Sequence, residues 1–186
     1  MKKSLLLATV ILAFASFAMA GTTVCDFETI GSGGTVPDGY CNITWGGSWG
    51  YYSGAQPPYN PHSGQFRTYE PVIGAAELTF TLNTPAVFDG AWFAGYAFST
   101  VYFNLYDASN NLLWTSASLD PSATPTWLGS GYSGLVSKVG VYSADQDYYV
   151  MDDVTYGTAT PEPGTLALLA TGAFGAFGAM RRRFVR

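Results

Sequence analysis

The chain has 186 residues, which is room for one domain of ordinary size plus targeting segments. Of its 8 basic residues, six lie before residue 21 or after residue 180, whereas only one of its 13 acidic residues, Glu162, lies outside residues 21–160. With 12 acids against Arg67 and Lys138, this central part has a net charge of about −10. Nucleic acid is therefore excluded as a partner, because its phosphates would be repelled.

The first 20 residues have the pattern of a signal peptide. Lys2 and Lys3 form a positive start, residues 5–17 are apolar, and Ala-Met-Ala at residues 18–20 is a small-x-small cleavage site before Gly21. A first membrane helix is the alternative, but the short apolar run and the cleavage site favour processing by signal peptidase. We expect residues 21–159 to be exported as one domain.

Two cysteines, Cys25 and Cys41, lie near the start of this exported part. In an oxidising compartment we expect them to form a disulfide, which for a loop of this length contributes up to ~3 kcal/mol. Reactive or metal-binding thiols are the alternative. No CxxC motif and no histidine cluster accompanies the two cysteines, so the disulfide is favoured.

The composition of residues 21–160, rich in Tyr, Trp, Phe, Val, Thr, Ser and Gly, is typical of strands and turns. Turn residues cluster at 31–39, 46–64 and 107–111. Between them we expect roughly eight to ten short strands and no long helix. The clearest candidates are residues 25–30, 40–45, 77–82, 86–94, 100–106, 112–119, 126–129, 135–142 and 148–156. This pattern predicts an all-β fold, an antiparallel β-sandwich of the jelly-roll kind.

Aromatic residues gather at the start of the long loop after the second predicted strand. The candidate ligand-binding residues are Trp45, Trp49, Tyr51, Tyr52 and Tyr59. Flat aromatic rings can stack on the faces of sugars, and binding residues are often found on loops. The alternative is that these rings pack over the edge of the sandwich.

No motif of the sequence carries a complete catalytic arrangement. Residues 46–50 match the G-x-S-x-G pattern of a nucleophile elbow around Ser48, but the strand, turn and helix that this motif requires are missing. The single histidine, His62, lies in the same proline-rich loop and cannot supply the usual zinc clusters alone. Nothing positive supports a glycosidase. We therefore expect no enzyme.

The two ends of the domain resemble the first and last strands of jelly-roll carbohydrate-binding modules. The opening reads Asp26-Phe27-Glu28, and the closing stretch contains Asp152-Asp153. In those families such acids commonly hold a structural calcium, so the resemblance implies Glu28 and Asp152 as its ligands, with Asp26 and Asp153 in reserve. Strand alternation places Asp152 beside Val150 and Val154 on the expected inner face. A carboxylate there needs either calcium or hydrogen-bond donors, and both alternatives stay open.

The chain closes on three parts in sequence. Pro161-Glu162-Pro163 is followed by the uncharged apolar residues 165–180, and then by Arg181, Arg182, Arg183 and Arg186. As a helix, residues 165–180 would be roughly 24 Å long, marginal for a hydrocarbon core of ~30 Å that snorkelling arginines can help to span. A buried core helix is the alternative, but it would not be uncharged on every face. We expect a transmembrane helix in the inner membrane with cytoplasmic arginines.

This order of parts resembles the PEP-CTERM sorting signal. The resemblance implies that an exosortase, a membrane enzyme of Gram-negative bacteria, recognises residues 160–186 and processes them. Exopolysaccharide producers that form biofilms commonly carry this system. The implied route is export, membrane anchoring through the tail, and then the cell surface or extracellular matrix. The same tail closes some proteins labelled with an ice-binding protein C-terminal domain.

Three functions follow from these expectations. The first is a surface or matrix protein whose β-sandwich binds exopolysaccharide. The second is a purely structural or protein-interaction component of the envelope. The third is ice binding, for which the pair Thr79 and Thr81 is too small a threonine array.

Overall fold

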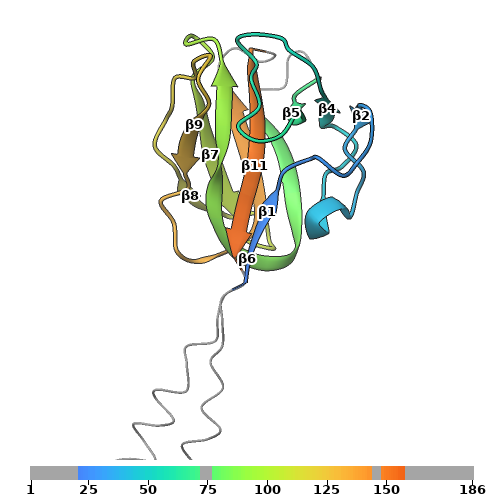
Figure 1. Ribbon diagram of the computed structural model, residues 1–186. Helices are drawn as coiled ribbons and strands as arrows, with labels where there is room; N and C mark the ends of the chain where they lie inside the picture. The colour runs from blue at the N-terminus through green and yellow to red at the C-terminus, as the bar shows by residue number, and fades with distance from the viewer. Residues whose placement is uncertain (1–20, 72–76, 144–147, 158–186) are drawn as a thin grey trace, which may run out of the picture. The chain divides into compact units, whose positions relative to one another are not determined.

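The computed structural model describes residues 21–71, 77–143 and 148–157 (Figure 1). Contacts within the chain group Gly21–Ala159 into one compact unit. The predicted signal peptide, the sorting signal and the transmembrane helix at residues 165–180 lie outside the described residues. Within the described ranges, no helix is long and apolar enough to cross a membrane.

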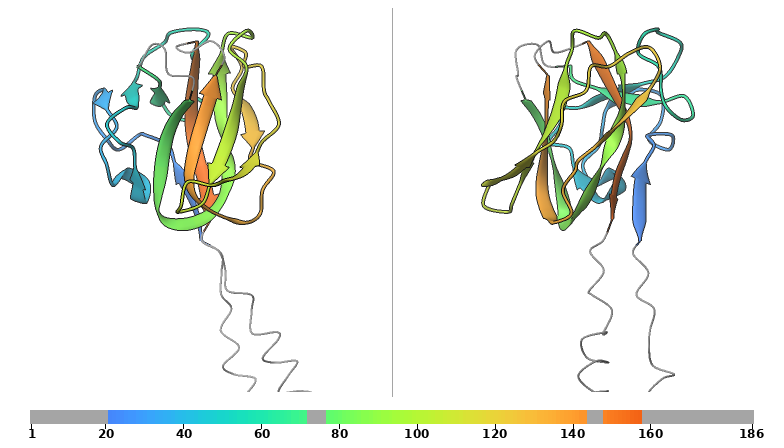
Figure 2. Two further views of the ribbon diagram at one scale, coloured as in Figure 1. Left: turned by 180° about the vertical axis from the view of Figure 1, so that it is seen from behind. Right: turned by 90° about the vertical axis from the view of Figure 1, so that its left-hand side faces the viewer.

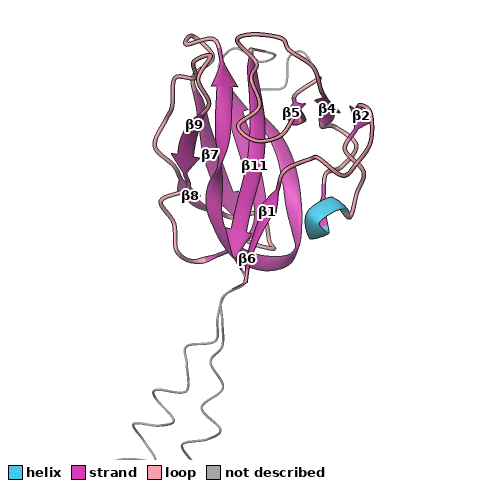
Figure 3. Ribbon diagram, viewed as in Figure 1, coloured by secondary structure: helices cyan, strands magenta, loops and turns pink. Residues whose placement is uncertain are grey.

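Strands make up almost all regular structure of the described residues (Figure 3). They are β1 (Thr22–Cys25), β2 (Gly34–Thr35), β3 (Ile43–Thr44), β4 (Gly50–Tyr52), β5 (Arg67–Tyr69), β6 (Glu77–Gly95), β7 (Val101–Tyr106), β8 (Leu112–Thr115), β9 (Thr126–Gly129), β10 (Leu135–Ser143) and β11 (Tyr149–Gly157). The only helix in these ranges is one turn of 3-10 helix, η1 (Tyr40–Asn42).

The long strand β6 joins two layers. Its first part pairs with β10 and β3, and its last part pairs with β11 and β9. Residues 83–85 are exposed just before the change of partner at Val87, and Figure 2 shows β6 curving from one layer into the other. Every pairing between the named strands is antiparallel. The predicted all-β antiparallel sandwich is therefore confirmed.

We call the layers sheet 1 and sheet 2. Sheet 1 has the order β3-β6-β10-β7-β8. Sheet 2 has the order β9-β6-β11-β5-β4-β2, with β1 paired to the end of β11. Rings of β6 meet Phe103 of β7 between the sheets, with centroid distances of 4.9 Å for Phe88 and 5.6 Å for Phe93. Burial of such large apolar rings is the main stabilising contribution to a fold of this kind.

The predicted disulfide is present and joins β1 to η1. Cys25 and Cys41 are bonded, with their Cα atoms 5.8 Å apart. Cys25 is fully buried, so the bridge fastens the N-terminal loop to the core. Prediction and structure agree here because a short loop with two exported cysteines leaves few other partners.

The strand predictions fail mainly where the backbone turns. The strand expected at residues 25–30 ends at Cys25, because Phe27 adopts a φ of 60°. The strand expected at 40–45 is the η1 turn followed by β3, since Cys41 and Asn42 also have positive φ. The two strands expected at 77–82 and 86–94 are one continuous strand, β6. Expectation and structure coincide at β9, residues 126–129.

Candidate binding site

Three of the five predicted ligand-binding rings belong to the core. Trp45 and Trp49 have no exposed surface, and Tyr51 is 6% exposed. The indole N–H of Trp45 donates to the carbonyl oxygen of Tyr40, and that of Trp49 to the carbonyl oxygen of Thr79, both at 3.1 Å. Because each polar atom is satisfied inside, these tryptophans can be buried without penalty. They cannot stack on a sugar in the folded domain, which corrects the prediction.

The other two rings, Tyr52 and Tyr59, line a pocket of about 290 Å³. The lining is completed by Gln56, Tyr69, Tyr149 and Val150. Tyr52 comes from β4, Tyr69 from β5 and Val150 from β11, while Gln56 and Tyr59 lie on the loop between β4 and β5. Neighbouring strands of sheet 2 and one covering loop thus bring four tyrosines together.

Tyr52 is held between two side chains of β5. The guanidinium carbon of Arg67 lies 3.9 Å from the centre of the Tyr52 ring, and the Tyr69 ring meets Tyr52 edge-on at 5.3 Å. Burial raises the pKa of the Tyr52 phenol, and the positive charge of Arg67 opposes that rise. A ring fixed by a cation and an aromatic neighbour loses little further freedom when a ligand binds.

Arg67 itself is fully buried. One terminal nitrogen, Nη1, donates to the carbonyl oxygen of Gln65 at 3.2 Å, while Nε and Nη2 have no hydrogen-bond partner among the described residues. No ion pair to Arg67 occurs in the same ranges. The guanidinium is therefore stabilised by one hydrogen bond and by its contact with the Tyr52 ring.

The loop that carries Tyr59 is fastened to β11 by two adjacent carboxylates. Asp152 Oδ2 accepts the backbone N–H groups of His62 at 2.8 Å and Ser63 at 3.0 Å. Asp153 lies 2.6 Å from Nδ1 of His62 and accepts the Ser63 hydroxyl at 2.9 Å. The His62 ring also stacks on Trp92 at 3.6 Å. This part of the loop is pinned by both backbone and side-chain contacts.

A third carboxylate, Glu28, fastens the next turn of the same loop. Its Oε1 accepts the backbone N–H groups of Gln65 and Phe66, each at 2.7 Å. The contact needs a glycine at position 64, since a Cβ atom there would lie 2.2 Å from the Glu28 carboxyl carbon. We call Glu28, Asp152 and Asp153, with the loop residues that they bind, the carboxylate latch.

The carboxylate latch involves Glu28 and Asp152, the two residues at which the resemblance implies a calcium ion. Oxygens of both residues accept backbone N–H groups, as in the hydrogen-bonded alternative. In the part of the chain that the structure describes, no group of three or more His, Cys, Asp or Glu side chains is arranged to hold a metal ion. Calcium at these two residues stays a prediction.

Asp152 lies on the outer face of sheet 2, opposite to the face predicted. It pairs with Trp92, whereas its neighbour Met151 pairs with Phe93, whose ring contacts the other sheet. Asp153 has a φ of 47° and interrupts the alternation on which the prediction depended. Asp152 is nonetheless only 2% exposed. Burial, aided by the charge of Asp153, raises the pKa of Asp152 to about 7, although N–H donors to its oxygens oppose the rise.

The G-x-S-x-G pattern does not form a catalytic group. Ser48 Oγ donates to the carbonyl oxygen of Gly46 at 3.3 Å, and no hydrogen bond joins Ser48 to His62 in the described ranges. The His62 ring is engaged by Asp153 and Trp92 instead. The single histidine therefore has a structural role in the latch.

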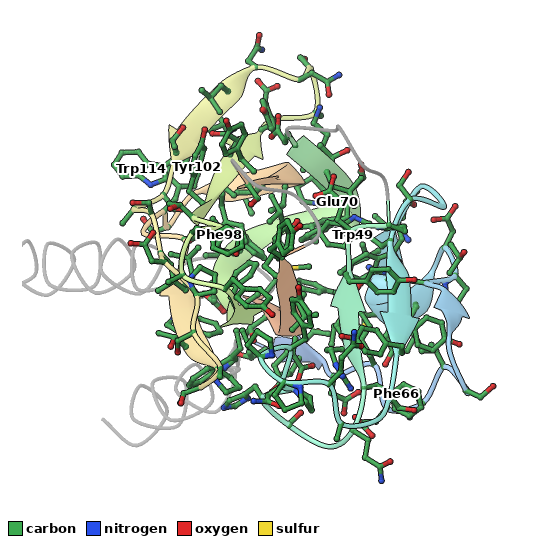
Figure 4. All side chains as sticks on the ribbon, turned by 90° about the horizontal axis from the view of Figure 1, so that it is seen from above. Trp49, Phe66, Glu70, Phe98, Tyr102 and Trp114 are labelled. Carbon is green, nitrogen blue, oxygen red and sulfur yellow. A yellow bond between two sulfur atoms is a disulfide. The ribbon has the colours of Figure 1, made fainter. Side chains whose placement is uncertain are left out.

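Sequence reasoning missed Gln56, Tyr69, Tyr149 and Val150 as pocket residues. Tyr69 lies on β5, a strand of three residues that is too short to stand out from the loops around it. Arg67 and Thr68 are both fully buried, so no alternation of buried and exposed residues marks this strand either. Figure 4 places Glu70, which follows this strand, near Trp49, whereas Trp114 of β8 lies at the far side of the domain.

A comparison with known protein families agrees with the predicted tail. A model of the PEP-CTERM protein-sorting motif matches residues 159–183, so the predicted sorting signal is confirmed. This motif implies export and membrane anchoring of the tail before processing. No curated protein matches the chain.

Similar solved structures are carbohydrate-binding modules of family 29. One has 12% identity and a TM-score of 0.41, over 75% of this chain and 90% of that chain. A mutant of CBM29-2 complexed with cellulohexaose has 11% identity and a TM-score of 0.43, over 75% and 92%. Another CBM29-2 mutant, complexed with mannohexaose, has 13% identity and a TM-score of 0.42, over 75% and 93%.

Proposed function

We propose that the exported domain binds a neutral extracellular polysaccharide and takes one or two of its sugar units into the tyrosine-lined pocket. The observation that carries this proposal is the pocket itself, where four tyrosines and a glutamine surround about 290 Å³. That volume is at the lower end of the range for small-molecule sites.

The lining suits a sugar chemically. The aromatic rings offer apolar contact to the C–H faces of a sugar ring. The hydroxyl at the edge of each tyrosine ring can form hydrogen bonds with the hydroxyls of the sugar. The Gln56 amide adds both a donor and an acceptor for sugar hydroxyls. Tyr52 is already fixed by Arg67 and Tyr69, so less conformational entropy is lost on binding.

The charge of the domain favours an uncharged ligand. Residues 21–160 hold 12 acidic residues against two basic ones. Of the two cations, Arg67 is fully buried behind Tyr52, and Lys138 lies on β10 of sheet 1, where it donates to Asn110. An acidic polysaccharide would approach the pocket against this net charge.

The ends of the domain are consistent with display on a tether. Thr22 of β1 pairs with Gly157 of β11, so the described chain starts and stops at one end of the sandwich. The pocket residues Tyr149 and Val150 lie at the opposite end of β11. At ~3.3 Å per residue, these two ends of β11 are roughly 25 Å apart. We propose that after exosortase acts on the tail the domain contacts exopolysaccharide at the cell surface or in the matrix.

Affinity electrophoresis tests the proposal. The purified domain of residues 21–159 is run through gels that contain soluble neutral glucans, mannans or galactans. We expect at least one polymer to retard the wild type, and Tyr52→Ala or Tyr59→Ala to weaken that retardation by about tenfold or more. The matched control is Trp114→Ala, an aromatic residue that is 46% exposed and distant from the pocket, which should leave retardation unchanged.

Two results would contradict the proposal. If no neutral polymer retards the wild type, the structural or protein-interaction role takes its place. If Tyr52→Ala and Tyr59→Ala bind as tightly as the wild type while both remain folded, the sugar site is elsewhere on the domain. Far-ultraviolet circular dichroism and the melting temperature verify folding in each variant.

A further inference from the structure

We propose that three exposed aromatic rings beside the pocket extend the binding surface, so that the ligand is a run of several consecutive sugar units in a linear neutral chain. These rings, Tyr96, Phe98 and Tyr148, are called the aromatic cluster. This inference rests on the proposed function and specifies its ligand. The pocket would take one part of the chain, and the cluster would stack on the units that follow.

The cluster is an exposed apolar surface with a defined geometry. Tyr96 is 43% exposed, Phe98 53% and Tyr148 44%. The rings of Tyr96 and Phe98 are stacked at 5.3 Å, and the Tyr148 ring contacts both, at 5.9 Å and 5.0 Å. Each ring is therefore in contact with the other two while still open to solvent. Contiguous exposed apolar rings of this kind mark binding surfaces more often than isolated ones.

The cluster is continuous with the pocket through Tyr59. That ring lines the pocket and also meets Tyr96 edge-on at 5.7 Å. Tyr148, in turn, directly precedes the pocket residue Tyr149 at the start of β11. A chain that leaves the pocket past Tyr59 would meet the cluster next.

The backbone under the cluster is held in place. The N–H of Tyr96 donates to the carbonyl oxygen of Tyr148 at 2.9 Å, and the N–H of Ser99 donates to the carbonyl oxygen of Tyr96 at 3.0 Å. The hydroxyl of Ser99, which is fully buried, lies 2.7 Å and 2.9 Å from those same two carbonyl oxygens. The rings thus project from a fixed base, which lowers the entropy cost of using them to bind.

A sugar chain fits the cluster better than a membrane does. Bacterial membrane surfaces are anionic and are met by lysines and arginines, but the domain has only Arg67, which is buried, and Lys138 on the other sheet. Two of the three rings carry phenol hydroxyls, which suit hydroxyl-rich sugars. The small volume of the pocket also leaves most of a longer chain outside it.

The test compares chain lengths. Oligosaccharides of two to eight units are prepared from the polymer that the wild-type domain retains, and their affinities for the 21–159 domain are measured by calorimetry. We expect affinity to rise with length by about tenfold or more and then level off. Phe98→Ala and Tyr148→Ala should each remove about five- to tenfold of the gain for the long chains and leave the disaccharide unaffected. Trp114→Ala serves as the matched exposed control.

The outcomes distinguish a failure of the extended surface from a failure of the sugar site itself. If Tyr52→Ala loses affinity at all lengths but Phe98→Ala and Tyr148→Ala do not, the pocket binds sugar and the extended surface is wrong. If the wild type binds no polysaccharide, both proposals fail. If the wild type instead co-sediments with vesicles of phosphatidylethanolamine and phosphatidylglycerol, and Phe98→Ala abolishes this, the cluster contacts membrane and the inference is overturned.

Discussion

The carboxylate of Glu28 allows a direct choice between a hydrogen-bonded latch and a calcium site. In the latch, one oxygen, Oε1, accepts the N–H groups of Gln65 and Phe66 at 2.7 Å each. Glu28→Ala removes both bonds, whereas Glu28→Gln keeps an acceptor oxygen of the same shape and loses only the charge. The two substitutions therefore separate the hydrogen bonds from the negative charge that a calcium ion would need.

The expected magnitudes follow from the two bonds. A hydrogen bond to a charged group contributes about 1.5–3 kcal/mol, and the lower value applies here because Gln65 is exposed. Glu28→Ala should then cost about 3 kcal/mol, or about 10 °C in melting temperature for a domain of this size. Glu28→Gln retains neutral bonds and should cost about 1 kcal/mol.

Thermal unfolding of the 21–159 domain, followed by circular dichroism with and without EDTA, is the measurement. The latch predicts that Glu28→Ala is much less stable than Glu28→Gln and that EDTA changes none of the melting temperatures. Calcium predicts a lower melting temperature of the wild type in EDTA and equal damage from the two substitutions. That second pattern would refute the latch and establish the calcium site.

Two further predictions concern β11 and β6. The pKa of Asp152 is about 7 in the folded domain, above the ordinary value near 4. The proton on Asp152 therefore stabilises the folded domain fully below pH 4, and this contribution to the free energy of unfolding, as much as about 4 kcal/mol, is lost as the pH rises from 4 through 7. Urea midpoints should therefore fall more between pH 5 and 8 for the wild type than for Asp152→Asn; an equal fall would contradict this assignment. At Gly90, where φ is 147°, a Cβ atom would lie 2.2 Å from a carbonyl oxygen of β9, so Gly90→Ala should cost at least about 3 kcal/mol in urea unfolding. Gly46→Ala, with φ 68° and no atom within 4 Å, should cost about 1 kcal/mol, and equal losses would exclude the β9 contact as the cause.

The carboxylate latch explains why the pocket could not be located from the pattern of residues. Glu28, Asp152 and Asp153 are far from residues 62–66 in the sequence, yet their contacts decide how the loop lies. The loop in turn carries Tyr59 to the pocket. Long-range contacts of this kind leave no periodic signal. The resemblance to calcium-binding strands therefore named the three acids, with Asp153 only in reserve, but not the donors they meet.

The aromatic residues show the same division. Composition and alternation established that Trp45 and Tyr52 lie in a domain of strands and turns. The two residues are only seven positions apart, and the sequence predicted a ligand-binding role for both. Burial separates them, because Trp45 packs on Phe80 in the core while Tyr52 faces outward against Arg67. Which side of a sheet a residue such as Tyr52 faces depends on how its short strand pairs with its neighbours, and that is a tertiary property.

Local patterns by themselves determined the class of fold, the disulfide and the sorting signal. Each depends on residues close together in the chain: alternation within a strand, two cysteines on one short loop, and a proline motif followed by an apolar run and arginines. The tertiary structure decided the rest. It bent β6 into both sheets, moved Asp152 to the outer face through the positive φ of Asp153, and assembled the tyrosine pocket from three strands and a loop. These features depend on pairings between segments that are distant in the chain. Their stability comes from contacts between those segments, so the residues of one segment do not predict them.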